Sequence, residues 1–123
     1  RRRAGWLDCV MLRQAVRLNS LTELALTKLD ILDGFETVRI CTGYRLDGQL
    51  IDHYPDRSDL VARVEPVYED LPGWQTDLTT ARESGELPAE AQAFLALVED
   101  QVGVPVNVVG VGAERDDYLL WTA

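Results

Sequence analysis

The sequence has few of the side chains from which most catalytic and metal sites are built. It contains one histidine and two cysteines in 123 residues. Cys9 and Cys41 lack the spacing of a C-x-x-C metal motif, and two cysteines make no disulfide framework. We therefore expect buried or half-buried thiols in a protein of the reducing cytoplasm. His53 lies in a polar stretch with no second ligand at a useful spacing, so we expect it in a loop rather than at a metal.

Larger patterns are missing as well. No apolar run is long enough to cross a bilayer and no signal-peptide pattern opens the chain, so we expect no membrane partner. The net charge of −9 argues against a nucleic-acid partner, because phosphate contacts need a basic surface. No G-x-x-x-x-G-K-[ST] loop occurs. The chain therefore lacks the usual cradle for the phosphates of a nucleotide.

The apolar patterning predicts an α/β or α+β unit with one hydrophobic core. A chain of 123 residues, 46% of them hydrophobic, is long enough for one core and too short to expect two. We expect the buried face of the first helix to carry Leu7, Met11, Ala15 and Leu18, and Asp47-Gly48 to form a hairpin turn. The periodicity predicts helices over 8–19 and 88–102, strands over 24–26, 38–46, 49–51, 64–71, 106–111 and 118–121, and a loop over 52–63.

The segment Thr27-Lys28-Leu29-Asp30 follows directly after a predicted buried strand. The Asp30 carboxylate could accept hydrogen bonds from N1–H and the amino group of guanine, whereas adenine would leave it unpaired. Charge-assisted hydrogen bonds contribute roughly 1.5–3 kcal/mol each, which in pairs is enough to select a base. Lys28 could lay its aliphatic stem across the base plane. A K-x-D triplet is also common, and solvated surface charge is the alternative.

Two further segments are candidates for binding. Arg1-Arg2-Arg3, beside a glycine turn, could hold phosphate or carboxylate oxygens bidentately, and the alternative is a frayed basic end. Gly110-Val111-Gly112 ends a predicted strand, where glycines let backbone groups approach a flat ligand closely. The alternative for this segment is an ordinary turn.

Taken in order, these segments resemble one family, the adenylosuccinate synthetases. R-R-R-A-G-W-L-D at residues 1–8 resembles the family's arginine-rich turn and the G-W-[LF]-D start of a helix. A-L-T-K-L-D-I-L-D-G at 25–34 resembles its L-T-K-L-D-[VI]-L-D-G block, and residues 66–74 resemble its P-x-Y-E-x-x-P-G-W segment. The resemblance runs over essentially the whole chain. It implies that residues 1–123 are the C-terminal portion of a larger mixed-sheet α/β ligase with short hairpin insertions.

The resemblance also implies an activity. The family joins IMP to L-aspartate at the expense of GTP, with Mg²⁺, and forms adenylosuccinate, GDP and phosphate in the first committed step of AMP synthesis. It implies no catalytic residue in this chain and places the phosphate loop and the Mg²⁺ site in an absent N-terminal part. We therefore expect the isolated chain to be inactive and the whole enzyme to be a cytoplasmic homodimer. The implied GTP-binding residues are Arg2, Lys28, Leu29, Asp30, Gly110, Val111 and Gly112, and the implied aspartate-binding residues are Arg1 and Arg2.

The chain departs from the family pattern at residues 110–113. The family usually has S-x-G-P where this chain has G-V-G-A. Without the serine hydroxyl and the rigid proline, only backbone contacts to the base remain there. The competing interpretation is a guanine-nucleotide-binding or interaction module that has lost the ligase chemistry. A glycine-rich phosphate loop with catalytic Asp and His upstream of Arg1 would favour the ligase.

Overall fold

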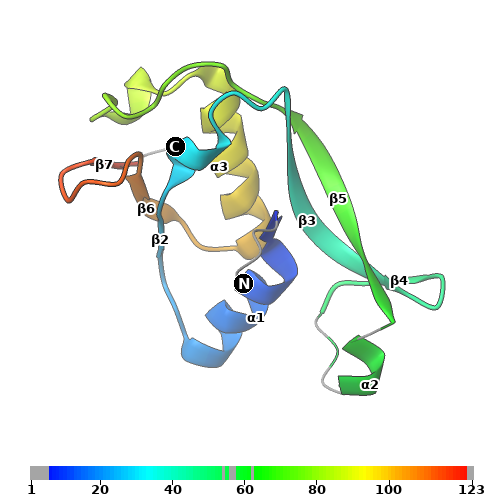
Figure 1. The fold of residues 1–123 in the computed structure, drawn as a ribbon. Coiled ribbons are helices and arrows are strands. Elements are labelled where there is room, and N and C mark those ends of the chain that lie inside the picture. The colour runs from blue at the N-terminus through cyan, green and yellow to red at the C-terminus, as the bar shows by residue number, and fades with distance from the viewer. Residues whose placement is uncertain (1–5, 54, 56–57, 62, 122–123) are drawn as a thin grey trace.

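A computed structural model of the chain describes residues 6–53, 55, 58–61 and 63–121. The described residues form two β-sheets, and helices α1 and α3 lie between them (Figure 1). One sheet contains β1, β3, β4 and β5, and the other contains β2, β6 and β7. Both sheets are mixed, because the pairs β1–β3 and β2–β6 are parallel while the other pairs are antiparallel. The predicted α/β class is confirmed.

The predicted strands and the two long helices are present, with ends that differ by at most one residue. The sequence did not predict β1 or the three short helices η1, α2 and η2. Helix α2 lies inside the segment predicted as a loop over 52–63. The elements are β1 (Leu7–Asp8), α1 (Cys9–Asn19), β2 (Leu24–Leu26), the 3₁₀ helix η1 (Leu29–Leu32), β3 (Thr37–Leu46), β4 (Gln49–Ile51), α2 (Ser58–Val61), β5 (Val64–Pro72), the 3₁₀ helix η2 (Ser84–Glu86), α3 (Ala89–Val102), β6 (Val106–Gly110) and β7 (Tyr118–Leu120).

Helix α1 begins at a side-chain cap. Oδ1 of Asp8 accepts hydrogen bonds from the backbone N–H groups of Val10 and Met11, at 2.9 and 3.2 Å. The predicted buried face was wrong, because Met11 and Leu18 are 51% and 74% exposed. The helix instead buries Cys9 and packs Leu12 and Val16 against the core, a second apolar stripe at positions i, i+3 and i+7.

Strand β3 forms the centre of the first sheet. Strand β3 pairs with β5 over its whole length and, past a tight turn, with β4. Asp47 and Gly48 have φ of 52° and 84°, the left-handed conformation that a two-residue hairpin turn requires, so the predicted turn is confirmed.

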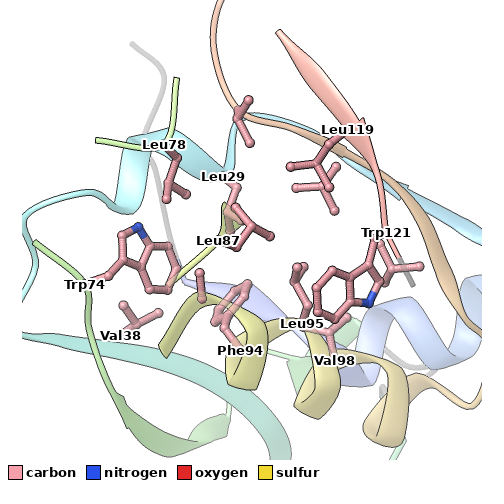
Figure 2. Close-up of a cluster of buried hydrophobic side chains, with 14 of the residues drawn as sticks. Leu29, Val38, Trp74, Leu78, Leu87, Phe94, Leu95, Val98, Leu119 and Trp121 are labelled. Carbon is pink, nitrogen blue, oxygen red and sulfur yellow. The ribbon is translucent and has the colours of Figure 1, made fainter. Parts of the chain in front are cut away.

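Helix α3 supplies the centre of the core. Its buried face carries Ala91, Phe94, Leu95, Val98 and Val102, which is the stripe that the periodicity predicts. Figure 2 shows Phe94, Leu95 and Val98 facing Leu29, Trp74, Leu119 and Trp121. Leu29 comes from η1 and Leu119 from β7, so the second sheet and the turn after β2 are fixed on this helix.

Candidate functional site

The two candidate binding segments that follow strands, residues 27–30 and 110–112, lie side by side. Strands β2 and β6 are parallel neighbours, and Leu26 of β2 pairs with Val109 of β6. Residues 27–30 and 110–112 therefore leave the sheet at the same edge, at the carboxyl ends of two parallel strands. Ligands of open α/β sheets bind at such an edge.

Gly110 packs closely against the backbone of residues 27 and 28. A Cβ at this position would lie 3.2 Å from the backbone nitrogen of Lys28 and 3.2 Å from the Cα of Thr27. Contacts this short are rare, so a side chain at residue 110 would require the Thr27–Lys28 backbone to shift by a few tenths of an ångström. The sequence predicts that glycine admits a ligand here, and the structure shows a further reason, which is the packing of one segment on the other.

Lys28 marks the turn from β2 into η1. Its φ of 60° lies in the left-handed region, which costs a residue with a Cβ on the order of 1 kcal/mol. The other described non-glycine residues with positive φ, Ser20 and Asp47, lie at a helix end and in a hairpin turn, where this conformation is common. The Lys28 side chain is exposed, while Leu29 is 2% exposed and belongs to the core. Only the backbone of Leu29 can therefore face a ligand.

Asp30 carries the clearest sign of a ligand at this edge. Its side-chain atom Oδ1 is buried and has no hydrogen-bond partner among the residues that the structure describes. A buried acceptor without a partner costs about 1–3 kcal/mol, so native proteins usually supply a donor. The Asp30 side chain as a whole is half-buried, so the carboxylate lies at the border between the core and this edge, with one oxygen unpaired among the described residues.

The 110–112 segment offers backbone groups only. Val111 is fully buried, and its N–H donates to the carbonyl of Asp117 at 2.8 Å. A Cβ on Gly112 would lie 2.3 Å from Oδ2 of Asp117, so the Asp117 carboxylate occupies the space where a side chain would be. A ligand could therefore contact only the other backbone carbonyl and N–H groups of residues 110–112.

Two residues that the sequence analysis did not identify support these segments. Asp33 follows η1, and its two oxygens accept from Nε1 of Trp74 at 2.8 Å and from the N–H of Leu78 at 3.1 Å. Asp117 closes the loop after β6 and pairs with Arg82 at 2.9 Å. Both carboxylates bind groups 35 to 45 positions away in the sequence, so no local motif could have shown them.

A hollow lies beside η1 and the end of β2. Its volume is about 150 Å³, and it is lined mainly by apolar side chains, including Trp6, Leu26 and Phe94. Lys28 and Leu29 line it, but Asp30 and residues 110–112 do not. The predicted binding residues Arg1 and Arg2 lie outside the described residues.

The cysteines take no part in this edge. Both are free and buried, as the sequence analysis predicts. Burial raises the pKa of the Cys9 thiol to about 11, and burial likewise raises the pKa of Cys41.

Within the described part of the chain, no cluster of three His, Cys, Asp or Glu side chains could hold a metal ion. None of the described helices has the length and apolar character needed to span a membrane.

The fold and this edge define a segment of an open α/β protein that presents polar and backbone groups where parallel strands end, as nucleotide sites do. The family model for adenylosuccinate synthetase matches residues 1–119. The chain is 53% identical over 118 residues to an adenylosuccinate synthetase from Halothermothrix orenii and 49% identical over 119 residues to one from Polynucleobacter necessarius subsp. necessarius. These alignments cover 96% and 97% of this chain.

A solved structure agrees with the sequence comparisons. The fold is similar to that of a fully ligated adenylosuccinate synthetase from Plasmodium falciparum, with a TM-score of 0.91 and 34% identity over 96% of this chain. The chain belongs to the adenylosuccinate synthetase family. It spans 28% and 27% of the two curated relatives and 29% of the solved chain.

Proposed function

We propose that the chain is the guanine-reading, C-terminal portion of a ligase that uses GTP to join IMP and L-aspartate into adenylosuccinate. Membership of the family supports the ligase class. The observation that carries the nucleotide assignment is the buried Oδ1 of Asp30, which has no partner among the described residues and lies where two parallel strands end. A base with donors on its edge would supply the missing hydrogen bond.

Guanine fits Asp30 better than adenine does. Guanine presents N1–H and the 2-amino group side by side, and one carboxylate can accept from both. Adenine has no proton on N1 and no 2-amino group, so it would leave the buried oxygen unpaired. The exposed Lys28 stands two residues earlier, and its aliphatic stem could cover one face of the base. Residues 110–112 would add backbone contacts from the neighbouring strand end.

The rest of the reaction needs groups from outside this chain. Phosphoryl transfer to the 6-oxygen of IMP depends on positioning and on neutralising charge, for which the family uses Mg²⁺. The described residues contain no metal-binding cluster and the sequence has no phosphate loop, so both would come from an N-terminal part. Arg1 and Arg2 would hold the aspartate substrate, with Arg2 also approaching the GTP phosphates. A cytoplasmic homodimer remains the expected state of the whole enzyme.

The activity assay uses the synthetase polypeptide that contains residues 1–123. We expect adenylosuccinate from IMP, aspartate and GTP, little product when ATP replaces GTP, and none from the isolated 123-residue chain. Product formed by the isolated chain would contradict the assignment of the chemistry to another part. Binding of GTP without any turnover by the longer polypeptide would favour a guanine-nucleotide-binding module instead.

A further inference from the structure

The loop after β6 is closed on itself by Asp117. The N–H of Val111 donates to the Asp117 carbonyl at 2.8 Å, and the Asp117 N–H donates to the Glu114 carbonyl at 3.1 Å. Oδ2 of Asp117 accepts from the Glu114 N–H at 3.1 Å. The same oxygen lies 2.3 Å from the place where a Cβ on Gly112 would be. The carboxylate therefore fills the inside of the loop and sets its shape.

Arg82 holds this carboxylate from a different part of the chain. Its Nη2 donates to Oδ1 of Asp117 at 2.9 Å, and its Nη1 donates to the carbonyls of Thr79 and Ala81 at 2.7 and 2.8 Å. Three acceptors thus fix the guanidinium in one orientation. The Asp117 side chain is 17% exposed, so water screens this pair less than it screens an ordinary surface pair.

The segment next to Asp30 depends on this arrangement more than a typical binding loop does. Residues 110–113 are Gly, Val, Gly and Ala, so none of them has a polar side chain that could adjust to a ligand. Val111 is buried, which leaves backbone groups as the means of contact. The position of a backbone carbonyl or N–H follows directly from the shape of the loop.

We propose that Asp117, held by Arg82, is a positioning residue that sets the affinity for the base of the nucleotide. This inference rests on the function proposed above. Loss of the carboxylate would loosen residues 110–112 and weaken binding of the base. It would not remove any group that acts on the phosphates, so substrate binding changes while the chemical step is retained.

The test is steady-state kinetics of the synthetase polypeptide that contains this chain, with Asp117→Asn. We expect KM for GTP to rise about tenfold, which corresponds to one lost charge-assisted hydrogen bond, while kcat and the KM values for IMP and aspartate change less than about twofold. Asp70→Asn is the matched control, because it breaks the exposed Arg39–Asp70 pair on another sheet. The control should leave all four constants unchanged.

Arg82→Lys provides a second variant in case Asp117→Asn does not fold. It keeps the positive charge but loses the fork that reaches Asp117, Thr79 and Ala81, so KM for GTP should rise about threefold with kcat retained. An unchanged KM for GTP in the folded variants would overturn the proposal. So would a loss of activity that falls on kcat or on all three KM values alike, because that pattern indicates general destabilisation.

A failure of the positioning role of Asp117 can be distinguished from a failure of the proposed guanine site. Asp30→Asn tests the guanine site itself through nucleotide preference. If Asp30→Asn shifts that preference while Asp117→Asn leaves KM for GTP unchanged, the positioning role is wrong and the guanine site stands. If Asp30→Asn leaves preference unchanged, the proposed guanine site and the inference built on it both fail.

Discussion

Replacing Asp33 with alanine should destabilise the fold by about 2–4 kcal/mol, because it leaves two buried donors without acceptors. Those donors are Nε1 of Trp74, 2.8 Å from Oδ1 of Asp33, and the N–H of Leu78, 3.1 Å from Oδ2. Trp74 and Leu78 are 2% and 1% exposed. Water therefore cannot easily replace either hydrogen bond. A loss of this size is a large part of the roughly 5–15 kcal/mol that stabilises a typical domain.

Asp77→Ala is the matched control for this change. Asp77 also accepts two hydrogen bonds, from the N–H and the hydroxyl of Thr79 at 2.9 and 2.7 Å, but it is exposed. These bonds lower the pKa of Asp77, yet water can take their place when the carboxylate is removed. Urea unfolding followed by tryptophan fluorescence gives both free energies of unfolding, and Trp74 itself reports on the Asp33 contact. Equal losses in the two variants would refute the reasoning that burial sets the cost.

Two further predictions concern stability. In a thermal scan, Gly73→Ala should lower the melting temperature far more than Gly85→Ala does. A Cβ on Gly73 would lie 1.8 Å from the carbonyl oxygen of Phe35, whereas a Cβ on Gly85 would meet nothing within 4 Å. Equal shifts in melting temperature would contradict this reasoning. The Cys9 thiol has a folded-state pKa of about 11, so the unfolded chain loses this proton first and stability should fall, by on the order of 2 kcal/mol, between about pH 9 and 11. Urea midpoints across that range should decline less in Cys9→Ala than in the unmodified chain, and parallel declines would count against burial of the thiol as the cause.

Local patterns in the sequence predicted the regular elements well. The stripe from Ala91 to Val102 has one apolar face, and that face is the buried one. Helix α1 is different, because it carries two apolar stripes. Periodicity alone cannot decide between Met11 with Leu18 and Cys9 with Leu12 and Val16, since the choice depends on which side meets the core. Strand β1 and helix α2 have two and four residues, too few for any period to be visible.

The candidate site was partly visible from the sequence for a similar reason. A polar T-K-L-D directly after an apolar run indicates a strand-end loop, and the structure places this loop beside residues 110–112. The parallel pairing that joins β2 to β6 links residues more than eighty positions apart, and no pattern within either segment encodes it. Asp33 and Asp117 were missed because their partners are also distant. The sequence therefore indicates which loops are candidates for binding, whereas only the fold shows what holds them in place.

The most direct test of the account is the nucleotide preference of the synthetase polypeptide before and after Asp30→Asn. Adenylosuccinate formation would be followed with GTP and with XTP at saturating IMP and aspartate. An asparagine side chain both accepts and donates, so its carbonyl can pair with N1–H of xanthine and its amide can donate to the 2-oxo group. We predict that kcat/KM for GTP falls by about two orders of magnitude while that for XTP rises, because two charge-assisted hydrogen bonds are exchanged. An active Asp30→Asn enzyme that still prefers GTP by the original ratio would contradict the assignment of Asp30 as the residue that reads guanine.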